Sequence, residues 1–126
     1  MTDRPPAQDT GFRDAAVIGS YHAHIYYEPE TRPEAERLRA EMERLFPAAI
    51  YGRWHDVPVG PHPSAMYQVA FAVELFPTLT PWLIVNRGNL TVFLHPNTGK
   101  ALTDHTRHAV WMGRQQVLDL RPLSDD

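Results

Sequence analysis

The sequence predicts one α+β domain whose elements follow the order strand, helix, strand, strand, helix, strand. A length of 126 residues suits a single domain with one core. With 43% hydrophobic and 21% charged residues, the chain can bury such a core. Four segments with two-residue apolar alternation are interrupted by two segments with helical spacing, which sets the order of elements.

The first strand is predicted over residues 18–27, which are rich in β-branched and aromatic side chains. Successive side chains of a strand point to opposite faces, so Ala23 and Ile25 share one face. His22, His24 and Tyr26 then share the other face. This strand is expected to have one apolar side and one side that carries imidazoles.

A helix is predicted over residues 32–46. Thr31 and Glu34 have the spacing of a capping box, and Pro33 stands in the first turn. Apolar residues then recur at helical spacing until Pro47. The charged residues of the other face indicate a solvated surface.

The second half of the predicted fold repeats this pattern. Residues 50–55 and 66–73 are expected to form strands, separated by a proline-rich loop over residues 57–64. A second helix is predicted to begin near Pro77 or Pro81 and to end at Gly88. The fourth strand is expected over residues 89–95, followed by a turn over residues 96–99 and a short edge strand over residues 117–120.

This order of elements is that of a split βαβ, or ferredoxin-like, βαββαβ sandwich, in which the first strand lies between the third and the fourth. If the helices cover the apolar faces, the opposite sheet face collects histidine, tyrosine, glutamine, threonine and phenylalanine. Such a face needs a cover of water or a second subunit. A homodimer that packs sheet on sheet, as in a dimeric α+β barrel, would enclose it.

Composition and charge exclude several classes of protein. The net charge is -3 and no basic run is present, so nucleic acid is not an expected partner. The absence of cysteine excludes disulfides and thiolate sites. No apolar run reaches the length of about 20 residues that spans a bilayer, so no membrane partner and a cytoplasmic location are expected.

The expected organisation has three parts. Residues 1–13 are predicted to be a flexible N-terminal segment, residues 14–120 a single domain, and residues 121–126 a flexible tail.

Seven histidines are the chemically distinctive feature of this short chain. Without cysteine, any metal site must use imidazole and carboxylate, a donor set that suits non-haem Fe(II) and also zinc or another divalent metal. His24, His62 and His95 are the predicted metal ligands. His22 is either a fourth ligand or an acid/base group beside the metal, because alternation alone does not decide which of the paired histidines binds.

Further candidates lie outside this set. Asp104 next to His105 suggests an oriented acid or base, or an anionic ligand, although a helix cap is an equally good interpretation. Arg53 and Arg87 are candidates for binding a substrate carboxylate, and either could instead make an ion pair. Nucleotide-binding glycine loops and the common hydrolase motifs are absent from the sequence.

Six short motifs together resemble the fungal-type DOPA 4,5-dioxygenase family. They are YHAHIYY at residues 21–27, GPHP at 60–63, NRG at 86–88, HPNTG at 95–99, DHT at 104–106 and WMG at 111–113. The resemblance implies a compact, commonly dimeric α+β fold and extradiol cleavage of a catechol ring, L-DOPA or a relative, with dioxygen and a non-haem metal.

On this interpretation His22 or His105 takes a catechol proton, and Arg53 or Arg87 holds the carboxylate of a DOPA-like substrate. Tyr26, Phe93 and Trp54 are candidates to stack on the ring. Two alternatives stay open: a non-catalytic dimeric protein that binds a metal or a small aromatic ligand, and a cofactorless monooxygenase with no metal on the histidines.

Overall fold

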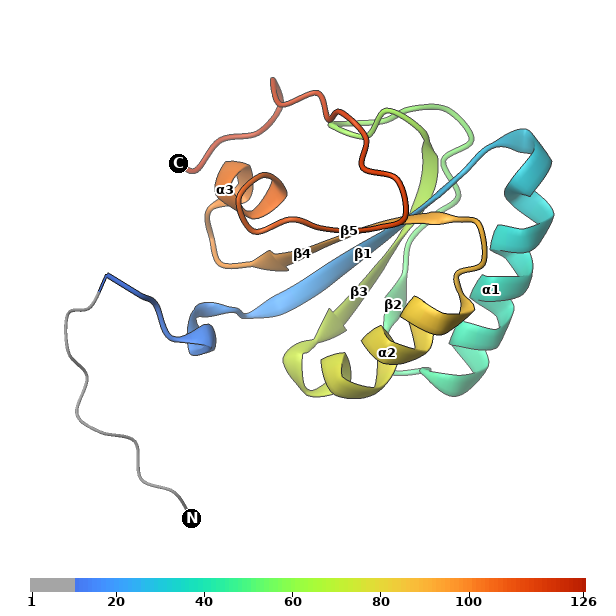
Figure 1. Cartoon of the computed structure of the whole chain (residues 1–126), viewed down its shortest axis with the longest axis horizontal. Helices are drawn as coiled ribbons and strands as arrows, with labels where there is room; N and C mark the ends of the chain where they lie inside the picture. The colour runs from blue at the N-terminus through green and yellow to red at the C-terminus, as the bar shows by residue number, and fades with distance from the viewer. Residues whose placement is uncertain (1–10) are drawn as a thin grey trace, which may run out of the picture.

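The computed structural model describes residues 11–126, which form one five-stranded antiparallel sheet with three α-helices (Figure 1). The strands are β1 (Ser20–Tyr27), β2 (Ile50–Tyr51), β3 (Ala65–Ala72), β4 (Thr91–Asn97) and β5 (Val110–Met112). The helices are α1 (Arg32–Leu45), α2 (Phe76–Asn86) and α3 (Ala101–His105). Most of the predicted flexible segment 1–13 lies outside the described residues.

The strand order is β2-β3-β1-β4-β5, with β1 between β3 and β4 as the sequence predicts. His22 faces Ala70 of β3 on one side and His95 of β4 on the other. His24 lies two residues further along β1, opposite Phe93. This register places histidines from two strands side by side on one face of the sheet.

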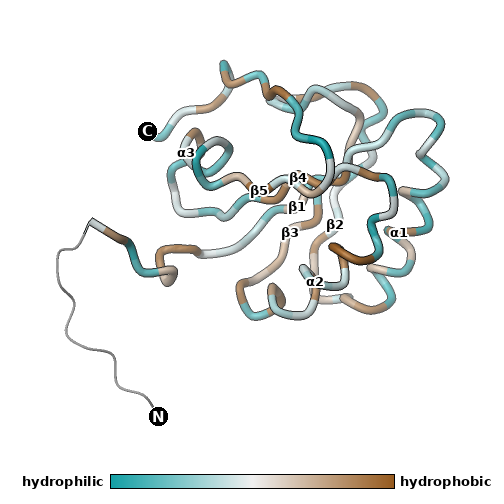
Figure 2. Tube along the Cα trace, in the orientation of Figure 1, coloured by the Kyte–Doolittle hydropathy of each residue, from teal (hydrophilic) through white to brown (hydrophobic). Residues whose placement is uncertain are grey.

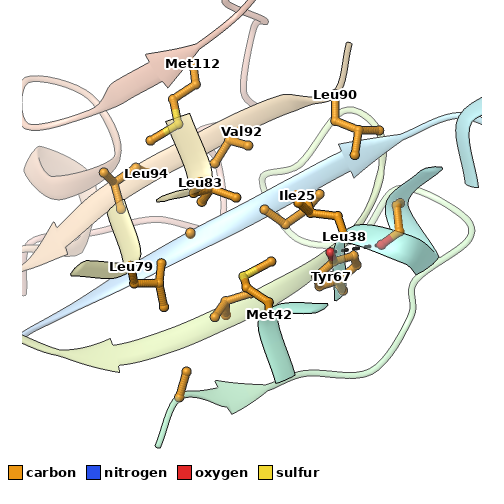
Figure 3. Packing of buried hydrophobic residues seen from close by; sticks show 14 of the residues in the cluster. Ile25, Leu38, Met42, Tyr67, Leu79, Leu83, Leu90, Val92, Leu94 and Met112 are labelled. Carbon is orange, nitrogen blue, oxygen red and sulfur yellow. Dashed lines mark hydrogen bonds between the residues drawn. The ribbon is translucent and has the colours of Figure 1, made fainter. Parts of the chain in front are cut away.

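The opposite face packs against α1 and α2 and forms the main core. Ala23, Ile25, Val69, Val92 and Leu94 are all buried there, so the predicted apolar face is confirmed. Figure 3 shows Leu79 and Leu83 of α2 and Leu38 and Met42 of α1 against the strands. In Figure 2, α1 alternates between hydrophilic and hydrophobic stretches, as an amphipathic helix does.

The histidine face is covered by segments of the same chain. Helix α3 and the residues after β5 lie on the side of the sheet away from α1 and α2 (Figure 1). The Asp119 N–H donates to the Pro61 carbonyl at 2.9 Å, which joins the C-terminal segment to the loop before β3. Asp125, in the segment expected to be a flexible tail, accepts hydrogen bonds from the Thr103 N–H and hydroxyl of α3 at 2.9 and 2.6 Å.

One predicted detail of the helices differs in the structure. The Thr31 hydroxyl does not cap α1, because a 3-10 turn, Pro29–Thr31, turns it back toward Glu28, whose N–H it accepts at 2.9 Å. Helix α2 begins at Phe76, next to Pro77, which is one of the two predicted starts, and it contains Pro81. Pro81 is the sixth residue of the helix, so it removes the hydrogen bond that an N–H at this position would donate to the Pro77 carbonyl.

Three strand predictions also need correction. Strand β2 ends at Tyr51, and pairing toward β3 continues as a hydrogen bond from the Gly52 N–H to the Gln68 carbonyl and an isolated bridge between His55 and Met66. Strand β4 extends through Pro96 into the predicted turn. The edge strand is β5, paired with β4, whereas residues 117–120 form no strand.

Among residues 11–126, no helix combines the length and apolar character that crossing a bilayer requires.

Candidate metal centre

Five imidazoles from four parts of the chain gather on the covered face of the sheet. His22 and His24 come from β1, His95 from β4, His62 from the loop before β3 and His105 from α3. Neighbouring ring centroids lie 4.0 to 6.0 Å apart. Alternation on the two strands explains three of these positions, and the loop and α3 supply the other two.

His24 and His95 form the buried centre of the cluster. Their Nε2 atoms are 3.3 Å apart, and the rings are nearly parallel. His95 Nδ1–H donates to the Pro96 carbonyl at 2.9 Å, which leaves its Nε2 with a lone pair in the neutral ring. Metal-binding histidines typically donate their second N–H to a carbonyl in this way.

The second nitrogen of His24 has no partner. Its Nδ1 is buried without a hydrogen bond in the described part of the chain. When two imidazole nitrogens bind one cation at about 2.0–2.1 Å in tetrahedral geometry, the distance between the nitrogens is close to the distance observed between the Nε2 atoms of His24 and His95. The neutral imidazole donors of this cluster therefore fit a transition-metal ion.

His22 completes a group of three. His22, His24 and His95 each offer a ligand atom, and these atoms lie within 4.8 Å of one another. His22 is only half-buried, so this side of the group is closest to solvent. The third predicted ligand, His62, is not in this group, although its ring centroid lies 4.2 Å from that of His24.

His62 is instead held by a tyrosine. The Tyr26 hydroxyl and His62 Nδ1 are 2.8 Å apart, and both side chains are buried. Burial raises the pKa of Tyr26 well above its usual value, so the phenol stays neutral. His62 therefore has one nitrogen engaged by a neutral hydroxyl, which fixes the orientation of its ring.

His105 lies on the other side of the cluster, with its ring centroid 4.0 Å from that of His95. Its Nδ1–H donates to the Ala101 carbonyl at 2.7 Å, so Nε2 is the acceptor atom of the neutral ring. The adjacent Asp104 makes no hydrogen bond to His105. Asp104 accepts from the Thr98 N–H and hydroxyl, both at 2.7 Å, and from His108 Nδ1–H at 2.8 Å.

Aromatic rings form the wall of the cluster. Phe93 stacks on Trp111 with centroids 4.6 Å apart, and His24 lies 5.7 Å from Phe93. Next to His105 a cavity of about 310 Å³ opens between Trp111 and the C-terminal segment, with Leu118 among its lining residues. The lining of this cavity is mixed, with the His105 imidazole and two glutamine side chains beside apolar groups, and such a lining can accept a flat polar ring.

Burial favours the neutral form of His22, His24, His62 and His95 by lowering their pKa values. Desolvation lowers the pKa of His62 to about 4 and that of His95 to about 3. The pKa of His24 is also lowered, first by burial and then by the neighbouring imidazoles, and burial lowers the pKa of His22. Neutral rings offer the lone pairs that a metal ion needs.

The structure does not bring the two predicted arginines to the imidazoles. Arg53 is exposed in the segment after β2, and Arg87 lines a cavity on the helix-covered face. Trp54 packs on that same face against Tyr27 and Tyr67, so the prediction that it stacks on a ring bound at the imidazoles is wrong. These positions lie in irregular segments just after β2 and α2, where strand alternation gives no guide to the face.

Sequence reasoning also missed features of the site. The hydrogen bond between Tyr26 and His62 and the wall formed by Trp111 and Leu118 were not predicted. Tyr26 was placed on the correct face by alternation, which was the available signal. The position of Leu118 depends on how the C-terminal segment crosses the sheet, and no local pattern encodes that path.

Two relatives can be aligned with most of this chain. An uncharacterized 21.2 kDa protein of Botryotinia fuckeliana is 40% identical over 118 residues, which cover 85% of this chain and 64% of that protein. The DOPA 4,5-dioxygenase of Amanita muscaria is 31% identical over 114 residues, which cover 84% of this chain and 50% of that enzyme. The chain thus spans about half to two thirds of the length of these relatives.

A solved structure agrees with these matches. The crystal structure of a candidate dioxygenase from Nostoc punctiforme superposes with a TM-score of 0.83 at 40% sequence identity, covering 85% of this chain and 92% of that one. The family model for the Dopa 4,5-dioxygenase family matches residues 21–122, a range that contains all five clustered histidines. With this match and these relatives, the chain belongs to the Dopa 4,5-dioxygenase family.

Proposed function

We propose that this protein is a metal-dependent dioxygenase that opens the ring of a catechol, L-DOPA or a related compound, beside one hydroxyl. The observation that carries the proposal is the convergence of five imidazoles beside Phe93 on one face of the sheet, with the Nε2 atoms of His24 and His95 3.3 Å apart. Membership of the Dopa 4,5-dioxygenase family supports the reaction class.

In this proposal His22, His24 and His95 hold the metal, because their ligand atoms form the compact group. Fe(II) is the expected ion, and zinc or another divalent metal also suits three imidazoles. When bound, the ion supplies a Lewis acid with open coordination positions. His62 stays the alternative third ligand, since its ring contacts that of His24.

The remaining histidines are placed to handle protons. His105 Nε2 is the acceptor atom of a ring fixed by Ala101, so it can take the proton of a catechol hydroxyl bound beside His95. His62, held by Tyr26, stands on the opposite side of the pair and can return a proton to the product. Phe93 and Trp111 exclude water and pack against the substrate ring.

The proposal also includes the fold of the domain and the assembly of the protein. The order β2-β3-β1-β4 with α1 and α2 on one face supports a ferredoxin-like domain over residues 14–120. A homodimer and a cytoplasmic location remain predictions from the sequence. Light scattering of the purified chain tests the first.

The test is anaerobic loading of the metal-free protein with Fe(II), followed by a catechol and oxygen. The expected result is oxygen uptake with a yellow ring-opened product for at least one of L-DOPA, dihydroxyphenylpropionate and catechol. His95→Ala should abolish both signals, whereas His55→Ala should retain them, since His55 lies outside the five-imidazole cluster.

Other outcomes separate the alternatives. Tight metal binding without oxygen uptake on any catechol would reject the dioxygenase and favour the metal-binding protein. Oxygen uptake by fully metal-free protein would favour a cofactorless monooxygenase. Metal analysis before and after loading distinguishes these two results.

A further inference from the structure

A second cavity opens on the helix-covered face, separated from the imidazoles by the sheet. It has a volume of about 640 Å³ and lies between α2 and the strands β4 and β5. Leu94, Val110 and Met112 form its floor, and Phe76 and Ile84 of α2 form one wall. Figure 3 shows Leu94 and Met112 beside Leu79 and Leu83, at the edge of the main core. We call this space the α2–β5 cavity.

The α2–β5 cavity has the size and lining of a small-molecule site. Its volume falls within the range of about 300–1,000 Å³ that is typical of ligand pockets, and its lining is mostly apolar. Ile84 and Val110 are each about half exposed, at 53% and 50%, so the cavity is open to solvent. Two large apolar side chains therefore lie uncovered at its mouth.

A cation stands at one end of this cavity. Arg87 is half-buried, and its Nη1 donates to the Leu90 and Gly88 carbonyls at 2.9 and 3.4 Å. A side chain at Gly113 would meet Arg87 Nη1 at 2.9 Å, so this glycine leaves the room that the guanidinium occupies. Arg87 makes no ion pair with any carboxylate of residues 11–126, and no acidic residue lines the cavity.

A neutral polar group adds to this charge. The Thr80 hydroxyl in the wall is buried and has no hydrogen-bond partner in the described part of the chain. A buried polar atom without a partner is costly, and a bound polar group or an ordered water can remove that cost. The cavity thus combines an apolar floor with a guanidinium that pairs with no carboxylate of residues 11–126 and a buried hydroxyl without a hydrogen-bond partner in that range.

We propose that the α2–β5 cavity binds an amphipathic organic carboxylate, with the carboxylate on Arg87 and the apolar body over Leu94, Met112 and Ile84. A guanidinium binds a carboxylate through paired charge-assisted hydrogen bonds. The apolar lining accepts either an aliphatic or an aromatic body. This site is independent of the proposed dioxygenase reaction, because it lies on the other face of the sheet.

Calorimetric titration of the full chain tests the proposal with decanoate, 3-phenylpropionate and the uncharged decanol. At least one of the two acids should bind with one site per chain, and comparison of the two identifies the aliphatic or the aromatic body. Arg87→Gln should weaken acid binding by about tenfold to a hundredfold, the usual effect of losing charge-assisted hydrogen bonds, and leave decanol binding unchanged. Arg37→Gln, at an exposed arginine of α1, is the matched control and should have no effect.

Three results would overturn the proposal. They are no binding of either acid at millimolar concentration, acid binding that is unchanged in Arg87→Gln, and a wild-type dimer that becomes monomeric in Ile84→Gln. The last result would show that a second copy covers the cavity. Ile84 is exposed, so the Ile84→Gln variant should fold. If the wild type and this variant are both monomeric, loss of acid binding in the variant supports the site.

Discussion

At the scale of single residues, hydrogen bonds to the clustered imidazoles distinguish the roles of side chains that share the same chemistry. His95 and His105 each donate Nδ1–H to a carbonyl and keep an acceptor Nε2, while His62 is engaged by a neutral phenol. If His22, His24 and His95 hold the metal, His95→Ala should lower Fe(II) affinity by more than a hundredfold. His62→Gln should retain the metal and lower turnover.

Metal content and turnover, measured on the same samples, check this assignment. The control is His55→Gln, which should change neither quantity. If His62→Gln loses the metal and His22→Gln retains it, the ligand set is His24, His62 and His95, as the sequence predicts. Tyr26→Phe should also retain the metal and should lower turnover less than His62→Gln does, because it removes only the hydroxyl that orients His62.

At the scale of elements, α3 is fixed to the end of β4 by one buried carboxylate. Asp104 is 2% exposed and accepts three hydrogen bonds, two from Thr98 and one from His108. Asp104→Asn replaces one acceptor oxygen with a donor, so it should lower the free energy of unfolding by about 1–3 kcal/mol. It should also displace His105 and lower turnover while the metal content stays constant.

Urea unfolding and metal analysis check this prediction. The matched control is Asp56→Asn, at an aspartate that accepts from Tyr27 and Arg32 but whose side chain is 62% exposed. Exposed ion pairs contribute about 0–1 kcal/mol, so the control should change stability little. Equal losses in the two variants, or loss of metal in Asp104→Asn, would show that Asp104 does not act by positioning α3.

The elements also show which parts of the fold are encoded locally. Two-residue alternation correctly predicted the core face of β1, β3 and β4, and with it the shared face of His22, His24 and His95. Helix α1 was predicted to within one residue, since its apolar spacing and flanking prolines are local signals. Strand β5 and the path of the C-terminal segment depend on contacts with β4 and Pro61, far away in sequence.

Loop positions show the same limit at the site. Arg87 follows α2 directly, and its face is decided by the turn at Gly88, which has a φ of +60° and would place a side chain against Glu34. Nothing local to Arg87 distinguishes the two sheet faces. The contact between His62 and Tyr26 likewise depends on a loop that folds back over β1. The strand-borne histidines were therefore predictable by alternation. His62 and His105 were also correctly named as candidates, but the hydrogen bond between His62 and Tyr26 was not predicted.

At the scale of the whole molecule, burying neutral imidazoles makes the metal-free fold sensitive to acid. The pKa of His62 is lowered to about 4 and that of His95 to about 3 by burial, whereas both titrate near 6.5 in an unfolded chain. Below pH 6.5 the unfolded chain binds protons that the fold excludes, so this contribution to stability is complete above pH 6.5 and falls as the pH drops toward the folded values.

Urea unfolding of chelator-treated protein between pH 7.5 and 5.0 measures this effect. The free energy of unfolding should fall below about pH 6.5 by up to about 1.4 kcal/mol per pH unit for each histidine that stays neutral in the fold. Carboxylates titrate mainly below this window, so the histidines dominate the slope. His62→Gln should reduce the slope of the unfolding free energy against pH by the contribution of one histidine, and His55→Gln should leave this slope unchanged. A slope that is flat, or equal in the wild type and His62→Gln, would mean that His62 accepts its proton inside the fold without cost, and the buried neutral cluster would then not describe the metal-free protein.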